Sequence, residues 1–287
     1  MVFFYGGGFE IGTIFQLYYD GRFLATIGDV IVVTANYRLG SFGFIYGGGK
    51  DYDGNMGLYD MKLALEWVQE NIAAFGGNPD QVTIFGESAG AISTGALIIS
   101  PLTKGLFHRA ILESGAPNSF FGTADIQRSS YKTQLLADEM NCPDKTPLGT
   151  IQCLKNKTIA QIVEGQRNAF PIDNRPSTTY GTEFLPHSPA EALMKGEFNH
   201  VDIIFGANDD EGSSFVDQIH PYLRQEDDGK KITKAMAKGL ISFMCSVTKE
   251  NYCKEMSEFY GSYMNETDHD QIRYRVLFIL NVFCFFF

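Results

Sequence analysis

A glycine-flanked serine between a strand and a helix constrains the fold of this chain more than any other feature. The stretch Gly86–Gly90 reads GESAG and follows the β-branched and aromatic run VTIF. Its last three residues begin the small-residue run SAGAISTGALIIS, which stops before Pro101. A chain that leaves a buried strand and enters a helix within a few residues forces the intervening serine into a strained turn, which flanking glycines permit. We therefore expect Ser88 to be a nucleophile displayed at the carboxyl end of a strand.

Apolar runs that resemble strands alternate with helical patterns along most of the chain. The runs MVFF, VIVVTANY, VTIF, AILESG and VDIIFG are each followed by glycine or a turn residue, as expected for strands covered on both faces. Apolar spacing over 58–72 predicts an amphipathic helix that ends at Gly76–Gly77, and Ser188 with Glu191 predicts a capping box at the start of another. The segments KKITKAMAKGLISFMCSV and KEMSEFYGSYM also look helical. The pattern predicts an α/β fold with a mainly parallel sheet and flanking helices, whose chemistry lies at the carboxyl ends of the strands.

The domain organisation is expected to be one partial domain over 1–287. Residues 118–175 carry a cysteine loop and helical fragments, and we expect them to form an excursion between core strands. The tail over 276–287 is an apolar run without a place in the fold, and it is well short of the roughly 20 residues that a membrane-spanning helix needs. The opening MVFFYGGGF lacks a charged region and a cleavage site, so we interpret it as a core strand rather than a signal peptide.

Composition excludes some partners. The chain has 23 Lys and Arg against 34 Asp and Glu, a net charge of −11, and no basic cluster interleaved with aromatic residues. Nucleic acid is therefore not an expected partner. The spacings of the cysteines match no zinc site, and we expect no metal and no cofactor.

Cysteines and sequons point to the secretory pathway or the extracellular space. Cys142 and Cys153 bracket a turn-rich loop of a size that a disulfide can close, and Asn156 and Asn265 each begin an Asn-x-Thr sequon. The total of five cysteines is odd, which leaves Cys245, Cys253 and Cys284 without an assigned pairing.

Acyl transfer also requires backbone N–H donors for the oxyanion. In an α/β-hydrolase one donor is the residue after the nucleophile, here Ala89, and the others come from a glycine-rich loop that follows an early strand. The sequence YGGG occurs at Tyr5–Gly8 and again at Tyr46–Gly49. The first copy directly follows a predicted strand, so we favour Gly7 and Gly8 as donors, with Gly6 supporting them.

Several motifs, in order, resemble the type-B carboxylesterases, the family that includes the cholinesterases. They are GGGF, NYRLGSFGF, GNMGLYDMKLALEWVQENIAAFGGNPDQVTIFGESAG, LFHRAILESG, GTEFLPHSPAEALMKGEF and GANDDEGSSF. The resemblance covers roughly Met1 to Phe215. The sequence departs from the family pattern at Met61, where glutamine is usual. The resemblance implies the α/β-hydrolase fold with a Ser-Glu-His triad. It maps the acid onto Glu211, a buried supporting glutamate onto Glu87, the family's loop disulfide onto Cys142 and Cys153, and the oxyanion donors onto Gly6, Gly7, Gly8 and Ala89.

Two parts of the triad stay open. Asp209 and Asp210 are rival acids, because any carboxylate at that strand end could orient an imidazole. The base should lie downstream of the acid, but His220 and His269 lack the Gly-x-x-His setting that the resemblance implies. We therefore expect a fragment that is truncated at both ends and inactive alone.

The expected activity is hydrolysis of small-molecule carboxylic esters through an acyl-enzyme. The alternative is a non-catalytic, cholinesterase-like adhesion or binding protein. Such relatives typically lack the serine, so Ser88 favours the enzyme. The sequence does not identify the ester.

Overall fold

The computed structural model describes residues 1–119, 122–170, 175–209, 211, 232–248, 253–265, 267–269, 271–272 and 276. These residues belong to two compact units, Met1–Gly206 and Ala207–Phe287. The single domain expected over 1–287 therefore stays a prediction. Among these residues, no helix combines the length and the apolar composition that a membrane span requires.

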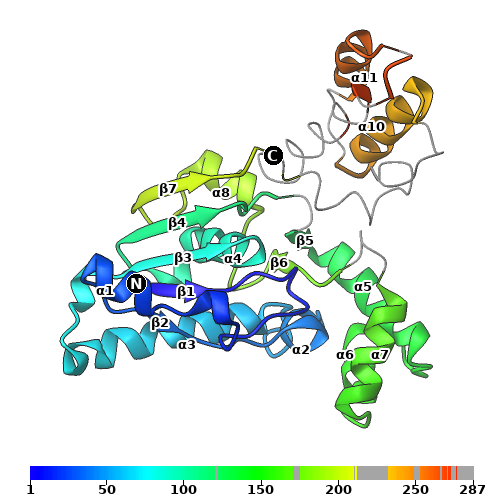
Figure 1. Cartoon of the computed structure of the whole chain (residues 1–287). Helices are drawn as coiled ribbons and strands as arrows, with labels where there is room; N and C mark the ends of the chain where they lie inside the picture. Colours follow the sequence, from blue (N-terminus) through cyan, green and yellow to red (C-terminus); the bar gives the residue numbers. More distant parts are fainter. Residues whose placement is uncertain are drawn as a thin grey trace. The chain divides into compact units, whose positions relative to one another are not determined.

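A parallel sheet forms the centre of the first unit (Figure 1). The sheet order is β2 (Val33–Thr34), β1 (Val2–Phe4), β3 (Thr83–Glu87), β4 (Arg109–Glu113) and β7 (Asp202–Gly206). Every neighbouring pair in it is parallel. Each strand lies within or overlaps one of the predicted runs, so the mainly parallel sheet with flanking helices is confirmed.

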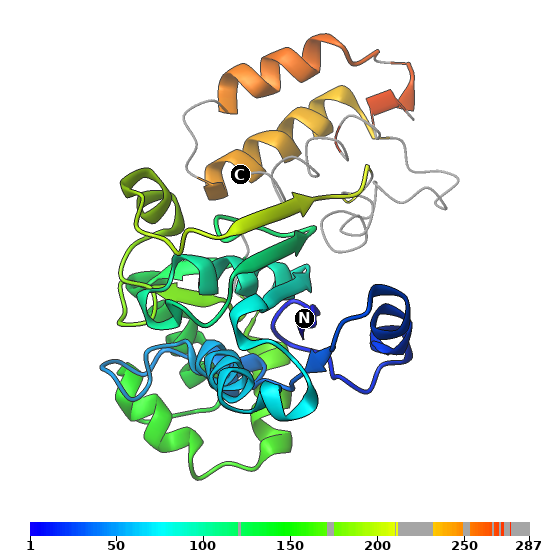
Figure 2. The same ribbon diagram turned by 90° about the vertical axis from the view of Figure 1, so that its left-hand side faces the viewer.

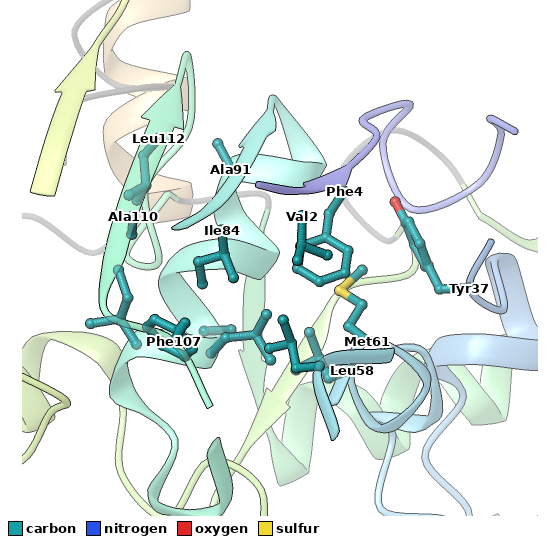
Figure 3. Close-up of a cluster of buried hydrophobic side chains, with 14 of the residues drawn as sticks. Val2, Phe4, Tyr37, Leu58, Met61, Ile84, Ala91, Phe107, Ala110 and Leu112 are labelled. Carbon is teal, nitrogen blue, oxygen red and sulfur yellow. The ribbon is translucent and has the colours of Figure 1, made fainter. Parts of the chain in front are cut away.

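The strand register builds a continuous apolar layer. Val2 pairs with Ile84, which pairs with Ala110, so these three side chains share one face of the sheet. Figure 3 shows this layer together with Leu58 and Met61 of α3 (Met56–Asn71). Met61, the departure from the family pattern, is only 1% exposed, so it fills the core rather than the site.

Helices α3 and α4 (Ala89–Ile99) follow the sequence expectations. The predicted helix over 58–72 begins at Met56, continues as the short η2 (Ile72–Phe75) and is terminated by Gly76 with φ 84°. Helix α4 ends before Pro101, where the predicted stop lies. The other helical segments of this unit before residue 120 are η1 (Leu17–Tyr19), α1 (Arg22–Gly28), α2 (Gly40–Phe44), η3 (Pro79–Gln81) and η4 (Pro101–Thr103).

Three helices lie in the described part of the excursion over 118–175. They are α5 (Ile126–Glu139), α6 (Pro147–Leu154) and α7 (Ile159–Ala169), and Figures 1 and 2 show them as one group. The predicted disulfide joins Cys142 to Cys153, with 5.9 Å between their Cα atoms. Two short strands, β5 (Thr123–Asp125) and β6 (Thr178–Tyr180), pair in parallel at the two ends of this excursion.

Two expectations were wrong in detail. Strand β7 was expected to be covered on both faces, but all of its residues are exposed, because it is the edge strand of the described sheet. The capping box at α8 (Pro189–Lys195) is half formed. Ser188 accepts the Glu191 N–H at 3.2 Å, but the Glu191 carboxylate faces Lys195 at 2.7 Å instead of returning to the cap.

The described part of the second unit contains the predicted helices α10 (Lys234–Thr248) and α11 (Cys253–Ser262). In the tail over 276–287, only Val276 is among the described residues.

Candidate active site

Ser88 occupies a strained position between β3 and α4. Its backbone has φ 55° and ψ −123°, a conformation that a residue with a side chain rarely adopts. The turn is fixed on both sides, because the Ser88 N–H donates to the Glu113 carbonyl at 2.9 Å and its carbonyl accepts from Ile92 at 2.9 Å. This is the serine geometry that the sequence predicts.

The glycines of the motif are required by close backbone approach as well as by the turn. A Cβ atom on Gly86 would lie 2.6 Å from the Phe4 carbonyl oxygen and 2.6 Å from the Gly90 carbonyl carbon. A Cβ on Gly90 would overlap the same Phe4 carbonyl. Strand β1 and helix α4 can approach each other this closely only because neither glycine has a side chain.

The first glycine loop lies against the serine. A Cβ on Gly6 would be 3.0 Å from the Ser88 Cβ and 2.7 Å from the Glu87 carbonyl oxygen. Gly7 and Gly8 have φ of 111° and 63°, values that favour glycine. The loop then closes on itself, because the Gly7 carbonyl accepts the N–H groups of residues 10 and 11, each at 3.1 Å.

Three N–H groups at this point have no hydrogen-bond partner in the described part of the chain. They belong to Gly7, Gly8 and Ala89. Ala89 is the first residue of α4, where an N–H has no acceptor within the helix. Backbone N–H groups of this kind can donate hydrogen bonds to an oxyanion that develops beside the serine.

The second glycine loop lies elsewhere in the first unit. Tyr46 and Asp53 form an isolated antiparallel bridge around it, and the Gly47 N–H donates to the Tyr52 carbonyl at 2.7 Å. A Cβ on Gly47 would be 2.5 Å from a side-chain carbon of Ile151 in α6. This copy therefore packs against the excursion, whereas the first copy contacts the serine.

Sequence analysis missed a pair of tyrosines that supports the first loop. The rings of Tyr5 and Tyr37 stack with 4.5 Å between centroids, and the Tyr37 hydroxyl donates to the Tyr5 carbonyl at 2.6 Å. Burial raises the pKa of Tyr37 far above its usual range, so this hydroxyl keeps its proton. The motif NYRLGSFGF contains Tyr37, but nothing in the local pattern indicates that it contacts Tyr5.

Glu87 differs from the resemblance. The family's glutamate is expected to be buried, but Glu87 is exposed, because it is the last residue of β3 at the carboxyl edge of the sheet. Its Oε2 atom lies 2.8 Å from the position that a Gly6 Cβ would take, so the side chain borders the glycine loop. The pKa of Tyr19 is raised chiefly by burial, with Tyr18 and Glu87 adding to the rise.

The acid falls in the second unit. The Glu211 carboxylate accepts from the backbone N–H of Asn208 at 2.9 Å and from its side-chain amide at 3.0 Å. Because Ser88 and Glu211 belong to different units, the role of Glu211 as the triad acid stays a prediction. The rival Asp209 is described, whereas Asp210 lies outside the described residues.

The histidines that are described have other partners. His108 precedes β4 and so lies at the amino-terminal ends of the strands, whereas Ser88 lies at their carboxyl ends. The N–H of Val82 donates to Nδ1 of His108 at 3.3 Å. His187 lies 3.0 Å from a carboxylate oxygen of Glu197. The His200 ring of the first unit contacts the Phe198 ring in a tilted arrangement, and Nδ1 of His269 in the second unit lies 2.8 Å from the Ile232 carbonyl oxygen.

No described histidine is hydrogen-bonded to the Ser88 hydroxyl, and His220 lies outside the described residues. Within the described residues there is also no group of three or more side chains suited to a metal ion.

Comparison with known proteins agrees with this geometry. The sequence matches the carboxylesterase family over residues 1–286. It is 40% identical to a cholinesterase of Mus musculus over 254 residues, which is 87% of this chain and 42% of that protein. It is 42% identical to an acetylcholinesterase of Danio rerio over 221 residues, which is 75% of this chain and 35% of that protein. The chain thus spans well under half the length of these two relatives. The family match, together with the parallel sheet and its strained serine, establishes that the chain belongs to the carboxylesterase family and has its α/β-hydrolase fold.

Proposed function

We propose that the protein hydrolyses small-molecule carboxylic esters, with Ser88 as the nucleophile. The Ser88 oxygen attacks the ester carbonyl as its proton passes to a base, and the base returns that proton to the leaving alkoxide, which gives the alcohol and an acyl-Ser88 intermediate. Water, which gives a proton to the same base, then attacks the acyl group. The carboxylic acid leaves, and the serine oxygen regains a proton from the base. The proton acceptor is not assigned to a residue of this chain, and Glu211 is proposed as the acid that orients it.

The oxyanion of each tetrahedral intermediate is proposed to accept hydrogen bonds from Gly7, Gly8 and Ala89. Each such donor contributes on the order of 3 kcal/mol to the barrier in enzymes of this kind. The backbone supplies these donors before the substrate arrives, because the turn at the Gly7 carbonyl and the start of α4 are formed without it.

One observation supports the proposal above all others. A glycine loop with unpartnered N–H groups lies against a serine held at φ 55°, and Gly6 has no room for a side chain between them. Strain of this kind persists only where the surrounding structure enforces it, and it is concentrated at functional sites.

A fluorophosphonate probe tests the proposal on the chain as it is. The probe is added with imidazole, which supplies a base from solution, and the modified residue is located by peptide mapping. We expect a covalent adduct on Ser88 that is absent from Ser88→Ala and unchanged in Ser130→Ala, a control serine on α5. Failure of the wild-type chain to form the adduct would remove the enzyme proposal and favour the non-catalytic, adhesion-type alternative.

The secretory or extracellular location is part of this proposal. It is supported by the disulfide between Cys142 and Cys153, because such bonds persist in oxidising compartments. Asn156 and Asn265 are both exposed, and we propose that they carry N-linked glycans. Removal of glycans by an endoglycosidase should lower the apparent mass of the secreted protein, and a mass that stays the same would contradict this assignment.

A further inference from the structure

An ion pair connects the glycine loop to a distant part of the chain. Glu10 follows the loop after Phe9, and its N–H donates to the Gly7 carbonyl at 3.1 Å. Its carboxylate Oε2 lies 3.4 Å from Nε of Arg175, a residue of the segment that leads into β6. The Glu10 side chain is 23% exposed and that of Arg175 is 40% exposed, so the pair is partly screened from solvent.

Arg175 is itself held in place. The buried Lys132 of α5 donates from Nζ to the Arg175 carbonyl at 2.8 Å and to the Ser177 hydroxyl at 2.6 Å. An amino group that is buried and hydrogen-bonded in this way fixes the backbone on either side of it. Glu10 therefore reaches an arginine whose backbone position is set by the excursion.

The segment that follows the glycine loop is not fixed by packing alone. Residues 10–13 border a cavity of about 520 Å³, whose other walls include Tyr37, Phe42 of α2 and Gln166 of α7. Open space beside a loop lets it move unless a specific contact holds it. The contact with Arg175 is such a restraint.

Arg175 partly offsets the cost of burying this carboxylate. Burial raises the pKa of the Glu10 carboxyl, and the positive charge of Arg175 acts in the opposite direction. Without Arg175, the half-buried carboxylate would therefore favour a position that is more exposed to solvent.

We propose that the Glu10–Arg175 ion pair positions the loop of Gly6, Gly7 and Gly8 against Ser88. Glu10 acts through the Gly7 turn, which aims the N–H groups of the loop, and it is a positioning residue rather than a catalytic one. This inference rests on the proposed function, because the loop needs its position only if it receives an oxyanion.

Two measurements on the full chain test the inference. NMR gives the amide exchange rates of residues 10 and 11, whose N–H groups close the Gly7 turn. Fluorophosphonate labelling of Ser88 with added imidazole gives the rate of reaction. The variants are Glu10→Gln, Arg175→Gln and the reciprocal exchange Glu10→Arg with Arg175→Glu. The control is Lys145→Gln, which removes an ion pair on the excursion surface.

We expect both single variants to speed exchange at residues 10 and 11 and to slow Ser88 labelling, each by roughly threefold to tenfold. The exchange in α3 should not change, the reciprocal double variant should recover both rates, and the control should match the wild type. Unchanged exchange at residues 10 and 11 would overturn the inference, as would faster exchange throughout the unit, which would indicate a purely structural role. If the wild-type chain never labels, the proposed function fails, and the exchange rates still decide whether the pair holds the loop.

Discussion

Replacement of Gly86 by alanine tests the close approach of β1 and α4 at the nucleophile. The added Cβ would lie 2.6 Å from both the Phe4 carbonyl oxygen and the Gly90 carbonyl carbon, whereas real Cβ contacts are essentially never shorter than 3.0 Å. Each neighbour must therefore move by at least 3.0 − 2.6 = 0.4 Å. Both are backbone groups in regular elements, so no flexible side chain can absorb the shift. We expect a loss of about 1–3 kcal/mol in the free energy of unfolding, the usual range for overpacked cores.

Urea titration followed by tryptophan fluorescence measures this loss, because the single tryptophan, Trp67, lies on α3 in the same unit. Gly206→Ala is the matched control, since a Cβ there meets no atom within 4 Å and the residue is already exposed. The control should stay within about 0.5 kcal/mol of the wild type. A Gly86→Ala chain as stable as the control would refute the argument from close approach.

Three further substitutions have defined outcomes. Tyr37→Phe removes the donor to the Tyr5 carbonyl and should lower the free energy of unfolding by about 1–2 kcal/mol in the same titration. An unchanged free energy of unfolding would contradict a stabilising role for this hydrogen bond. Because burial raises the pKa of Glu10, its contribution to stability is present below the unfolded pKa and lost as the pH rises through the folded value. The free energy of unfolding of Glu10→Gln, measured relative to the wild type, should therefore shift in favour of the variant between about pH 4 and pH 8, and a shift in the opposite direction would contradict the sign. Replacing Cys142 and Cys153 by serine should lower the free energy of unfolding of α5–α7 by about 2–3 kcal/mol, measured by hydrogen exchange in a urea titration. An unchanged free energy would contradict the bond, as would two free thiols in non-reducing peptide mapping of the wild type.

The main sheet could be predicted from sequence because each strand is a short apolar run bounded by glycine or turn residues. The elbow at Ser88 could be predicted for a related reason: the strand, the glycines and the helix are contiguous, so local chemistry specifies the turn. Strands β5 and β6 could not, since the sequences TAD and TTY are too short and polar to show a period.

Other features were missed for different reasons. Glu191 was expected to complete a capping box, but Lys195 and His187, each four residues away along the chain, compete for its carboxylate, and this local spacing was not weighed against the cap. Glu10 and Arg175 are far apart in sequence, and each reads alone as an ordinary surface charge. The exposure of β7 was also not foreseen, because an apolar run has the same composition at an edge as in the middle of a sheet.

The identification of Ser88 as the nucleophile is tested most directly by trapping its acyl intermediate. The purified chain is mixed with a nitrophenyl acetate ester and imidazole, quenched in acid, and digested for mass spectrometry. The account predicts one acetyl group on the peptide that contains Ser88, and no such group in Ser88→Ala. Because imidazole itself cleaves nitrophenyl acetate, release is compared with that of imidazole alone, and the excess should be one nitrophenolate per acetylated chain. Without imidazole, hydrolysis by the chain should fall to the residual level that remains when a triad member is missing. An acetyl group found on another residue, or rapid turnover without imidazole that survives Ser88→Ala, would contradict the account.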